Sequence, residues 1–326
     1  MRPAVSVIVL VYGVEEYIAE CARSLFGQTL KDLEFIIVDD CSPDASMAIL
    51  ERILDEEFPQ RRGQVKILRN EVNRGQAYSR RVGVEAATGE YTIHFDSDDR
   101  AEPGMLERMY SEARKHDADA VVCAWYRDDE PVPTRYNRIE ENIRDLILGD
   151  MVAVGEIQSL WRYMVKRELY SRGIEFPVFN QGEDHALLVQ LIWNSKDVYC
   201  VPEPLYHWRT NMLSVTRDPS AQGIKRRFEG DCANARLVEA FLTRQGVRER
   251  FVSQLAALKL QAMFDLRPLL RKGECLAEWR SAFPEIKGKV LSNKHIIFAH
   301  KLEYIIARYC PAAIVKLVYR WRSCCR

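Results

Sequence analysis

Residues 90–99 read EYTIHFDSDD, an apolar run that ends in three aspartates within four positions. The run at 91–95 predicts a buried strand. Carboxylates crowded at a strand end repel one another unless a cation lies between them, and ligands of open α/β sheets bind in the crevice beyond the carboxyl ends of the strands. The cluster therefore predicts a site for a hard divalent cation that bridges carboxylate and phosphate. An acidic turn with a helix N-cap is the alternative for an isolated motif of this kind.

Strand and helix patterns alternate through the first 126 residues. Predicted strands cover 5–11, 33–38, 65–68, 91–95 and 120–126, and predicted helices cover 15–26, 44–58, 76–87 and 103–116. Alternation at this pitch predicts an α/β fold with a doubly wound, mostly parallel sheet. Later elements are predicted at 159–165, 184–193, 198–201 and 205–208, with an irregular stretch over 127–157 and a helical pattern from 219 onward.

The net charge is zero, but the two parts of the chain carry opposite charge. Residues 224–326 hold 21 Lys and Arg against 9 Asp and Glu, a net of +12, so residues 1–223, with 26 against 38, carry −12. The nine cysteines show no CxxC or zinc spacing, which favours free thiols in a reducing, cytoplasmic setting. No apolar stretch approaches the roughly 20 residues of a spanning helix, and the short run after the N-terminus lacks a signal-peptide cleavage site.

The last predicted helix is amphipathic and basic. Its apolar stripe follows the spacing i, i+3, i+4 and i+7, and three basic residues lie off the stripe. The stripe consists of Ile314, Leu317, Val318 and Trp321, and the basic residues are Lys316, Arg320 and Arg322. Two locations suit such a helix: the interface of an anionic membrane, or a docked position on its own domain.

Polar residues also follow other predicted strands. Tyr12 and Glu15 follow the first strand, Asp39 and Asp40 end the second, and the sequence NRG at 73–75 precedes the third helix. Each group alone is typical of a turn. Their recurrence at successive strand ends favours one shared ligand site.

Taken in order, these motifs resemble family 2 glycosyltransferases with the GT-A fold. The matching stretches are VSVIVLVY at 5–12, SLFGQT at 24–29, FIIVDDCS at 35–42, NRG at 73–75, ATGEY at 87–91, FDSDD at 95–99 and GED at 182–184. The resemblance is close over 4–126 and looser to about 216. It implies a GT-A domain over 1–216, with a nucleotide-binding half at 1–126 and an acceptor half at 127–216, followed by a basic helical region at 217–326.

The resemblance implies an inverting transferase that moves a hexosyl or N-acetylhexosaminyl group from a nucleotide-sugar, with UDP-sugar expected. The implied acceptor is a hydroxyl of a glycan or lipid-linked molecule in cell-surface polysaccharide synthesis. Donor contacts fall on Val11, Tyr12, Glu15, Asp39, Asp40, Arg74, Arg80, Asp96 and Ser97, with Asp39 or Asp40 at the base.

Metal and base roles follow from the same resemblance. Asp96, Asp98 and Asp99 would hold ribose and Mn²⁺ or Mg²⁺, with Asp98 as the direct ligand. Asp184, beside Glu183, would deprotonate the acceptor hydroxyl as it attacks the anomeric carbon in a single in-line displacement. The alternative for this pair is two helix N-terminal carboxylates that the helix dipole favours.

A lid is implied near His207 and residues 214–217, and His207 there is either a metal or phosphate contact or a hydrogen-bonded structural residue. Two positions depart from the family pattern: Gly13 replaces an Asn, and Ser79-Arg80-Arg81 replaces Ala-Arg-Asn. Both bear on donor binding.

Three other functions are less consistent with the sequence. A sugar nucleotidyltransferase has a basic, Gly-rich loop after its first strand, whereas residues 12–16 are acidic here. A dinucleotide-binding protein would carry G-x-G-x-x-G at that place. A non-catalytic nucleotide- or glycan-binding module would not need the retained aspartates. Nucleic acid is not an expected partner, and peripheral attachment at the cytoplasmic membrane face is.

Overall fold

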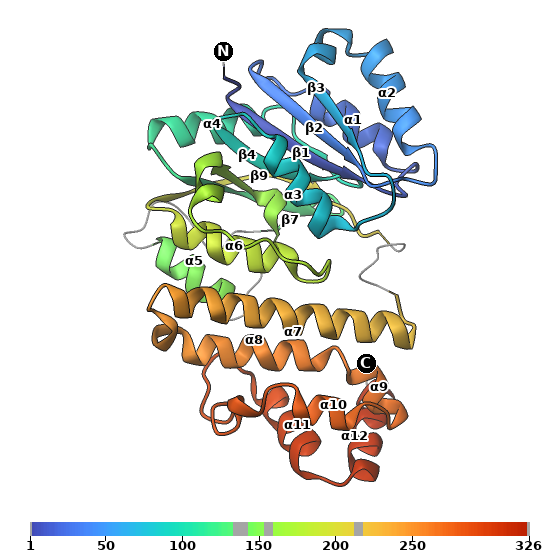
Figure 1. Ribbon diagram of the computed structural model, residues 1–326, viewed down its shortest axis with the longest axis vertical. Coiled ribbons are helices and arrows are strands. Elements are labelled where there is room, and N and C mark those ends of the chain that lie inside the picture. Colours follow the sequence, from blue (N-terminus) through green and yellow to red (C-terminus); the bar gives the residue numbers. More distant parts are fainter. Residues whose placement is uncertain (1, 133–142, 153–158, 212–217, 325–326) are drawn as a thin grey trace. The chain divides into compact units, whose positions relative to one another are not determined.

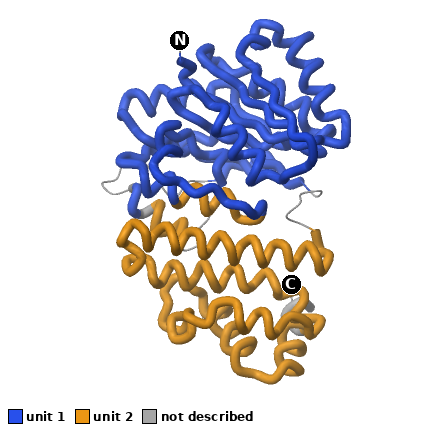
Figure 2. Tube along the Cα trace, in the orientation of Figure 1, with its two compact units in different colours: residues 1–146, 159–180, 190–212 blue, residues 147–158, 181–189, 213–326 orange. Residues whose placement is uncertain are grey.

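The computed structural model describes residues 2–132, 143–152, 159–211 and 218–324 (Figure 1). The chain forms two compact units (Figure 2): unit 1 comprises residues 1–146, 159–180 and 190–212, and unit 2 comprises 147–158, 181–189 and 213–326. The expected domain boundary at 216 stays a prediction. In the described part of the chain, no helix combines the length and the apolar character needed to cross a membrane.

Unit 1 is built on one mixed sheet with the strand order β3-β2-β1-β4-β8-β6-β9-β5, and β7 pairs with β6. The strands are β1 Val5–Val11, β2 Leu33–Asp39, β3 Val65–Arg69, β4 Tyr91–Asp96, β5 Arg100–Ala101, β6 Ala120–Arg127, β7 Glu130–Val132, β8 Tyr163–Lys166 and β9 Val198–Trp208. The neighbours β3, β2, β1 and β4 are all parallel, so their carboxyl ends meet at one edge.

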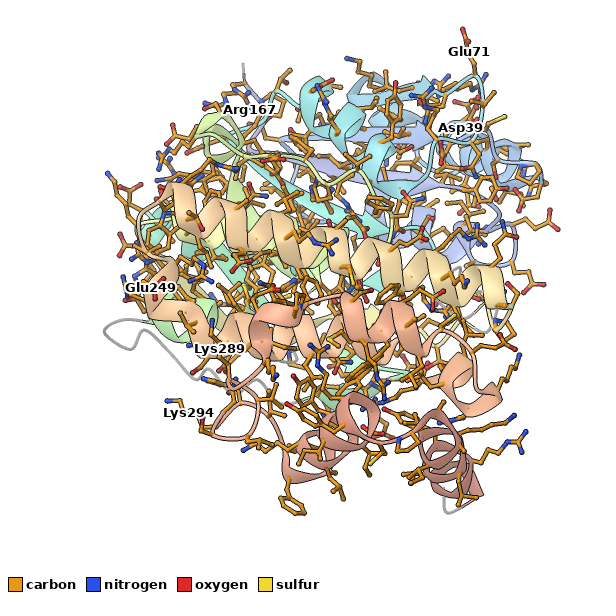
Figure 3. The ribbon with its side chains drawn as sticks, turned by 60° about the horizontal axis from the view of Figure 1, so that its bottom comes forward. Asp39, Glu71, Arg167, Glu249, Lys289 and Lys294 are labelled. Atoms are coloured by element: carbon orange, nitrogen blue, oxygen red, sulfur yellow. The ribbon has the colours of Figure 1, made fainter. Side chains whose placement is uncertain are left out.

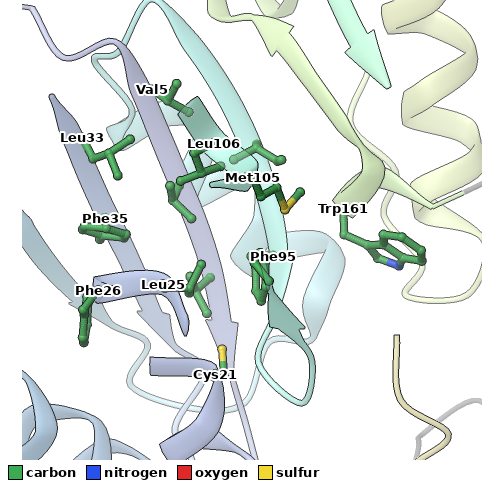
Figure 4. Close-up of a cluster of buried hydrophobic side chains, with 14 of the residues drawn as sticks. Val5, Cys21, Leu25, Phe26, Leu33, Phe35, Phe95, Met105, Leu106 and Trp161 are labelled. Carbon is green, nitrogen blue, oxygen red and sulfur yellow. The ribbon is translucent and has the colours of Figure 1, made fainter. Parts of the chain in front are cut away.

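Helices cover both faces of this parallel half. They are α1 Ile18–Phe26, α2 Ser46–Glu56, α3 Gln76–Ala86 and α4 Met105–Lys115. Side chains of α1, α2 and α4 join alternate β1 residues such as Val7 and Val9 in the larger core (Figure 4). Ile8, which points to the other face, packs with Val84 of α3. Because strand side chains alternate between faces, the continuous apolar runs of these strands bury both sides. The predicted doubly wound α/β arrangement is confirmed.

The second half of the sheet departs from a simple parallel order. β8 lies antiparallel between β4 and β6, and β9 pairs parallel with β6. The two short strands expected at 198–201 and 205–208 form one strand, because pairing with β6 continues past Pro202 and Pro204 through register shifts on either side of Ala124. A bulge of this kind accommodates residues that cannot donate to the ladder.

Two helices extend across the division between the units: α5 Ile143–Val152, in a stretch expected to be irregular, and α6 Glu183–Asn194. The rest of unit 2 is helical, as expected from 219 onward. Its helices are α7 Ala221–Arg244, α8 Val252–Phe264, α9 Arg267–Lys272, α10 Leu276–Ser281, α11 Phe298–Tyr309 and α12 Ala312–Cys324.

Candidate active site

The polar strand ends of unit 1 meet as the sequence predicts. Val11 of β1 is paired with Asp39 of β2, and the preceding Leu10 is paired with Asp96 of β4. Asp39 of β2 and Asp96 of β4 are therefore close to the same level at the carboxyl edge of the sheet, on either side of β1 (Asp39 is labelled in Figure 3). This edge is where open α/β sheets bind ligands.

The neighbouring aspartates Asp39 and Asp40 differ in their surroundings. Asp40 is buried, and its carboxylate accepts hydrogen bonds from the backbone N–H groups of Arg74 (2.8 Å) and Gly75 (2.7 Å) and from Asn70 Nδ2 (2.7 Å). Asp39 is half-buried and accepts one hydrogen bond of 2.9 Å from the Ser42 N–H. Asp40 thus fixes the loop before α3, and Asp39 is the better placed of the two to meet a nucleotide base.

The loop after β1 is held by the loop before α2. Gly13 N–H donates to Ser42 Oγ at 2.9 Å, and Glu15 exchanges two 3.0 Å hydrogen bonds with Asp44 and Ala45. Asp44 also accepts from the N–H of Ser46, the first residue of α2. This bracing leaves Tyr12, 44 % exposed, at the surface of the loop. The predicted contact of Tyr12 with a nucleoside stays a prediction.

Val11 takes a different place from the predicted one. Its side chain is fully buried in the core, and its carbonyl accepts from the Asp40 N–H at 3.0 Å. The side chain therefore does not line a nucleoside pocket, because strand alternation turns it inward.

The aspartates after β4 divide in the same way. Asp99 is buried, and its two oxygens accept from Tyr206 Oη (2.7 Å) and the Arg209 N–H (2.8 Å). Asp98 is half-buried and accepts from Asn211 Nδ2 at 2.9 Å. Both oxygens of Asp99 are therefore engaged in holding the end of β9, not in binding ribose or metal. Asp96 and Asp98 remain partly exposed. Ser97 between them is buried.

Negative charge accumulates at this point. Burial, followed by the charges of Asp96 and Asp98, raises the pKa of the Asp99 carboxyl well above its usual value. Burial and the same three aspartates also raise the pKa of the Cys21 thiol. Tyr206 has a raised pKa because of burial and then the charges of Asp99 and Asp96. Bringing a cation to this edge would relieve the repulsion.

The described protein side chains at this edge do not form a complete metal site by themselves. Among the described residues, no group of three or more His, Cys, Asp and Glu side chains has an arrangement that could hold a metal ion. The half-buried carboxylates of Asp96 and Asp98 nevertheless fit a cation whose other ligands are phosphate oxygens and water, which is the usual pattern for Mg²⁺. Protein and donor diphosphate together would complete such a site.

His207 has structural partners on both ring nitrogens. Nε2 lies 2.6 Å from Glu102 Oε1, Nδ1 lies 3.0 Å from Asp129 Oδ1, and the ring stacks on Tyr126 at 4.2 Å. Both nitrogens are therefore occupied, and the structure does not support the prediction of metal or phosphate contact by His207. The predicted lid residues 214–217 lie outside the described residues.

The two arginines predicted near the phosphates also differ. Arg74 is exposed, and its guanidinium lies 4.5 Å from the centre of the Tyr78 ring. Arg80 is buried on α3. The pKa of His94 is lowered first by the burial of its own ring and second by the charge of Arg80. Burial limits Arg80 as a direct phosphate contact, whereas Arg74 is accessible.

No local pattern in the sequence marks Asn180 as important. Gly75, with φ +83°, is the N-cap residue of α3 and has no side chain to cap the helix. Asn180 Oδ1 takes that role by accepting from the Ala77 N–H at 3.1 Å, and its carbonyl accepts from Gln76 Nε2 at 2.6 Å. A Cβ on Gly75 would lie 2.1 Å from Asn180 Nδ2, so only glycine fits.

The predicted catalytic residues, Glu183 and Asp184, belong to unit 2, whereas the strand-end residues belong to unit 1. Glu183 and Asp184 form the first turn of α6, where the helix dipole favours negative charge. Glu183 is buried and Asp184 is half-buried.

Comparisons with known proteins agree with this architecture. Residues 6–184 match the family model "Glycosyl transferase family 2". The chain is 31 % identical over 233 residues to the uncharacterized glycosyltransferase EpsJ of Bacillus subtilis, which covers 67 % of this chain and 64 % of EpsJ. It is 29 % identical over 307 residues to the putative glycosyltransferase EpsH of the same organism, covering 91 % of this chain and 83 % of EpsH. The chain thus spans less than two thirds of EpsJ.

Solved structures confirm the GT-A fold class. Residues 1–349 of S. aureus TarS superpose with a TM-score of 0.69 at 19 % identity, covering 99 % of this chain and 92 % of that one. TarS has also been solved with UDP-GlcNAc. The mannosyltransferase PcManGT of Pyrobaculum calidifontis, solved with GDP-Man and Mn²⁺, gives a TM-score of 0.55 at 17 % identity over 97 % of this chain and 88 % of that chain.

Proposed function

This chain belongs to glycosyl transferase family 2, and from that premise we propose that it transfers a sugar from a UDP-sugar to an acceptor hydroxyl with inversion at the anomeric carbon. The observation that carries the proposal is the alignment of Asp39 with the Asp96–Asp98 segment at the carboxyl edge of the sheet, where the parallel strands β2 and β4 flank β1. One nucleotide-sugar would contact both groups of residues, with its base at Asp39 and its ribose and diphosphate at Asp96 and Asp98.

The chemistry of Asp39 suits a uracil base. A carboxylate accepts a hydrogen bond from the N3–H of uracil, and charge-assisted hydrogen bonds are strong. Tyr12, exposed on the braced loop after β1, provides an aromatic surface for the nucleoside. The likeness to TarS, whose structure holds UDP-GlcNAc, supports the same donor class, and an N-acetylhexosaminyl group is our first choice of transferred sugar.

Asp96 and Asp98 would hold Mn²⁺ or Mg²⁺ against the diphosphate, and that ion would supply Lewis-acid stabilisation of the departing charge. Asp98 is oriented by Asn211. Asp99 keeps the adjacent end of β9 in place through Tyr206 and the Arg209 N–H. Exposed Arg74 adds positive charge for the phosphates.

Asp184 is the proposed general base. It would take the proton of the acceptor hydroxyl while the oxygen forms its bond to the anomeric carbon and the bond to the diphosphate breaks. Because this is one displacement, the configuration inverts, in parallel with inverting glycoside hydrolysis.

The assay measures the release of nucleoside diphosphate from a panel of UDP-, GDP- and dTDP-sugars, with Mn²⁺ or with EDTA. We expect turnover of at least one UDP-sugar and loss of it in EDTA. Asp98→Asn should abolish this turnover, whereas Asp55→Asn, a change at an exposed aspartate of α2, should not. No turnover with any UDP-sugar, or turnover that Asp184→Asn leaves intact when an acceptor is supplied, contradicts the proposal.

The acceptor is proposed to be glycan or lipid-linked, because unit 2 carries a surface suited to an anionic bilayer. We call this the α11–α12 surface: exposed apolar side chains on the two helices and the residue before them. They are Ile297, Phe298, Leu302, Tyr309, Ile314 and Leu317. Phe298 is 81 % exposed and Leu317 is 68 % exposed, whereas large apolar side chains are usually buried. On α12 the core receives Val315 and Tyr319, which lie outside the predicted stripe, whereas Ile314 and Leu317 of that stripe are exposed.

The charge around this surface is nearly all positive. Residues 286–326 contain nine Lys and Arg and a single acidic residue, Glu303. Glu303 is buried and paired with Arg267, so it presents little charge to a partner. Lys289 and Lys294 extend from the segment before α11 (Figure 3). Exposed apolar groups among lysines are the pattern of helices that bind anionic lipid surfaces.

Sedimentation with phosphatidylglycerol-containing vesicles tests whether the α11–α12 surface binds an anionic membrane. Phe298→Asp and Lys294→Glu should each weaken binding, and so should higher salt, because surface charge is screened. Val178→Asp is the matched control, since Val178 is 87 % exposed in unit 1. Equal binding of the wild type to neutral and anionic vesicles, or undiminished binding by Phe298→Asp, contradicts membrane docking by this surface.

A further inference from the structure

Helix α7 of unit 2 contacts the segment that leads into the proposed base. Asn234 is 3 % exposed, and its Nδ2 donates a hydrogen bond to the carbonyl of Gln181. Gln181 lies three residues before Asp184. A buried amide that holds a backbone carbonyl restricts the path of the chain at that residue.

The next residue is held even more closely. Gly182 has φ +72°, a conformation that glycine adopts without strain. A Cβ there would lie 2.5 Å from Asp231 Oδ1 and 3.4 Å from Asn234 Nδ2, so both α7 side chains lie against the Gly182 backbone. The Gly182 carbonyl then accepts from the Ala186 N–H at 3.2 Å, which begins the hydrogen bonding of α6.

Asp231 belongs to a small set of charged groups. It shares a hydrogen bond with Asp265, the residue that follows α8. Glu183 of α6 and Arg227 of α7 also lie close enough to act on it electrostatically. Burial, then the hydrogen bond and charge of Asp265, raises the pKa of Asp231 to about 9, so Asp231 carries a proton at neutral pH.

We propose that Asn234 and Asp231 are positioning residues, which hold Gln181 and Gly182 and thereby set the direction of Asp184 in the first turn of α6. The inference rests on the proposed role of Asp184 as general base. It makes α7 part of the catalytic apparatus, although α7 lies outside the residues that match the family model.

The main test is Asn234→Ala, with Asn293→Ala as its matched control. Asn293 is also a buried asparagine of unit 2, and its Nδ2 donates to the Ser253 carbonyl at 2.7 Å. Both variants lose one buried amide–carbonyl hydrogen bond, so we expect similar shifts of the urea midpoint. Only Asn234→Ala should lower kcat, by about 10- to 100-fold, since misplacement by about 1 Å has an effect of that size.

The donor measurements separate positioning from loss of binding. The Kd of UDP with Mn²⁺ and the KM of the UDP-sugar should stay near wild-type values in Asn234→Ala, because the donor residues belong to unit 1. Wild-type kcat in folded Asn234→Ala, or equal kcat losses in the two asparagine variants, overturns the inference. Absence of turnover in the wild type would instead count against the proposed function itself.

A pH profile adds a readout that a purely structural role would not change. Ionisation of Asp231 adds negative charge beside Glu183 and Asp265, with Arg227 as the nearby counter-charge. We therefore expect wild-type kcat/KM to change above about pH 9. Asp231→Asn should lose that alkaline change, and a profile identical to wild type would refute the role of Asp231.

Discussion

Exchanging the two neighbouring aspartates for asparagine, one at a time, should separate scaffold from ligand contact. Asp40→Asn is expected to destabilise the fold, and Asp39→Asn is expected to weaken UDP binding with little change in stability. The two changes are chemically identical and adjacent in the chain, so each serves as the control for the other.

The magnitude for Asp40→Asn follows from its three donors. One asparagine oxygen can still accept from Asn70 Nδ2 and the Arg74 N–H, but the amide nitrogen then faces the Gly75 N–H, 2.7 Å from the original oxygen. One buried donor loses its partner and two hydrogen bonds lose a charged acceptor, which together cost about 2–4 kcal/mol. The loop at 73–75 should loosen as well, so UDP binding also weakens in this variant.

Asp39→Asn removes much less protein contact. Asp39 accepts from the Ser42 N–H, and its ion pair at 3.8 Å is with Arg69, whose side chain is 61 % exposed. Solvent screening makes that pair worth little, so the loss of stability should stay below about 1 kcal/mol. Losing a charge-assisted hydrogen bond to the base, worth about 1.5–3 kcal/mol, should raise the Kd of UDP by roughly 10- to 100-fold.

Urea unfolding followed by tryptophan fluorescence, together with calorimetric titration of UDP in Mn²⁺, measures both effects. The reasoning is refuted if Asp39→Asn unfolds at lower urea than Asp40→Asn. It is also refuted if Asp39→Asn binds UDP as tightly as the wild type.

Three further changes test other contacts. His207→Ala should leave the Mn²⁺ concentration for half-maximal activity unchanged while removing about 1–3 kcal/mol of stability; a shifted Mn²⁺ requirement would restore the metal prediction. Because the folded chain keeps the Asp231 proton up to about pH 9, whereas the unfolded chain releases it near pH 4, stability should fall as pH rises between these values. Urea unfolding at about pH 5, 7 and 9 should show a shallower fall for Asp231→Asn. Gly83→Ala places a methyl group 2.4 Å from a β1 side chain. Overpacking should lower the free energy of unfolding by about 1–3 kcal/mol, which outweighs the gain of about 1 kcal/mol from the higher helix propensity of alanine. The control is Gly104→Ala, which has open space around it and should unfold like the wild type.

The parallel half of the sheet could be predicted closely from sequence. The strand expected at 5–11 is β1 Val5–Val11, and the strand expected at 91–95 is β4 Tyr91–Asp96. Strands buried on both faces read as unbroken apolar runs, so their ends, and the polar residues that follow them, are visible in the chain. That is why the meeting of Asp39 and Asp96 at one edge followed from the sequence.

Other features depend on contacts between distant residues. The insertion of β8 between β4 and β6 has no local signal, since strand order depends on non-local pairing. The different environments of Asp39 and Asp40 arise because consecutive strand-end residues point in opposite directions. Tyr206, Asn180 and Asn234 each act on residues 50 or more positions away, and nothing in their immediate sequence marks these roles.

The antiparallel β8 also has a consequence for synthesis on the ribosome. β4 ends at residue 96 and β8, its neighbour on the side opposite β1, begins at residue 163, so 163 − 96 = 67 positions separate them. Until that stretch has left the exit tunnel, a nascent chain presents one edge of β4 with unpaired backbone groups, and such edges recruit other strands. We expect nascent chains stalled before residue 163 to depend on chaperones, and chains that extend past β9 to become resistant to aggregation.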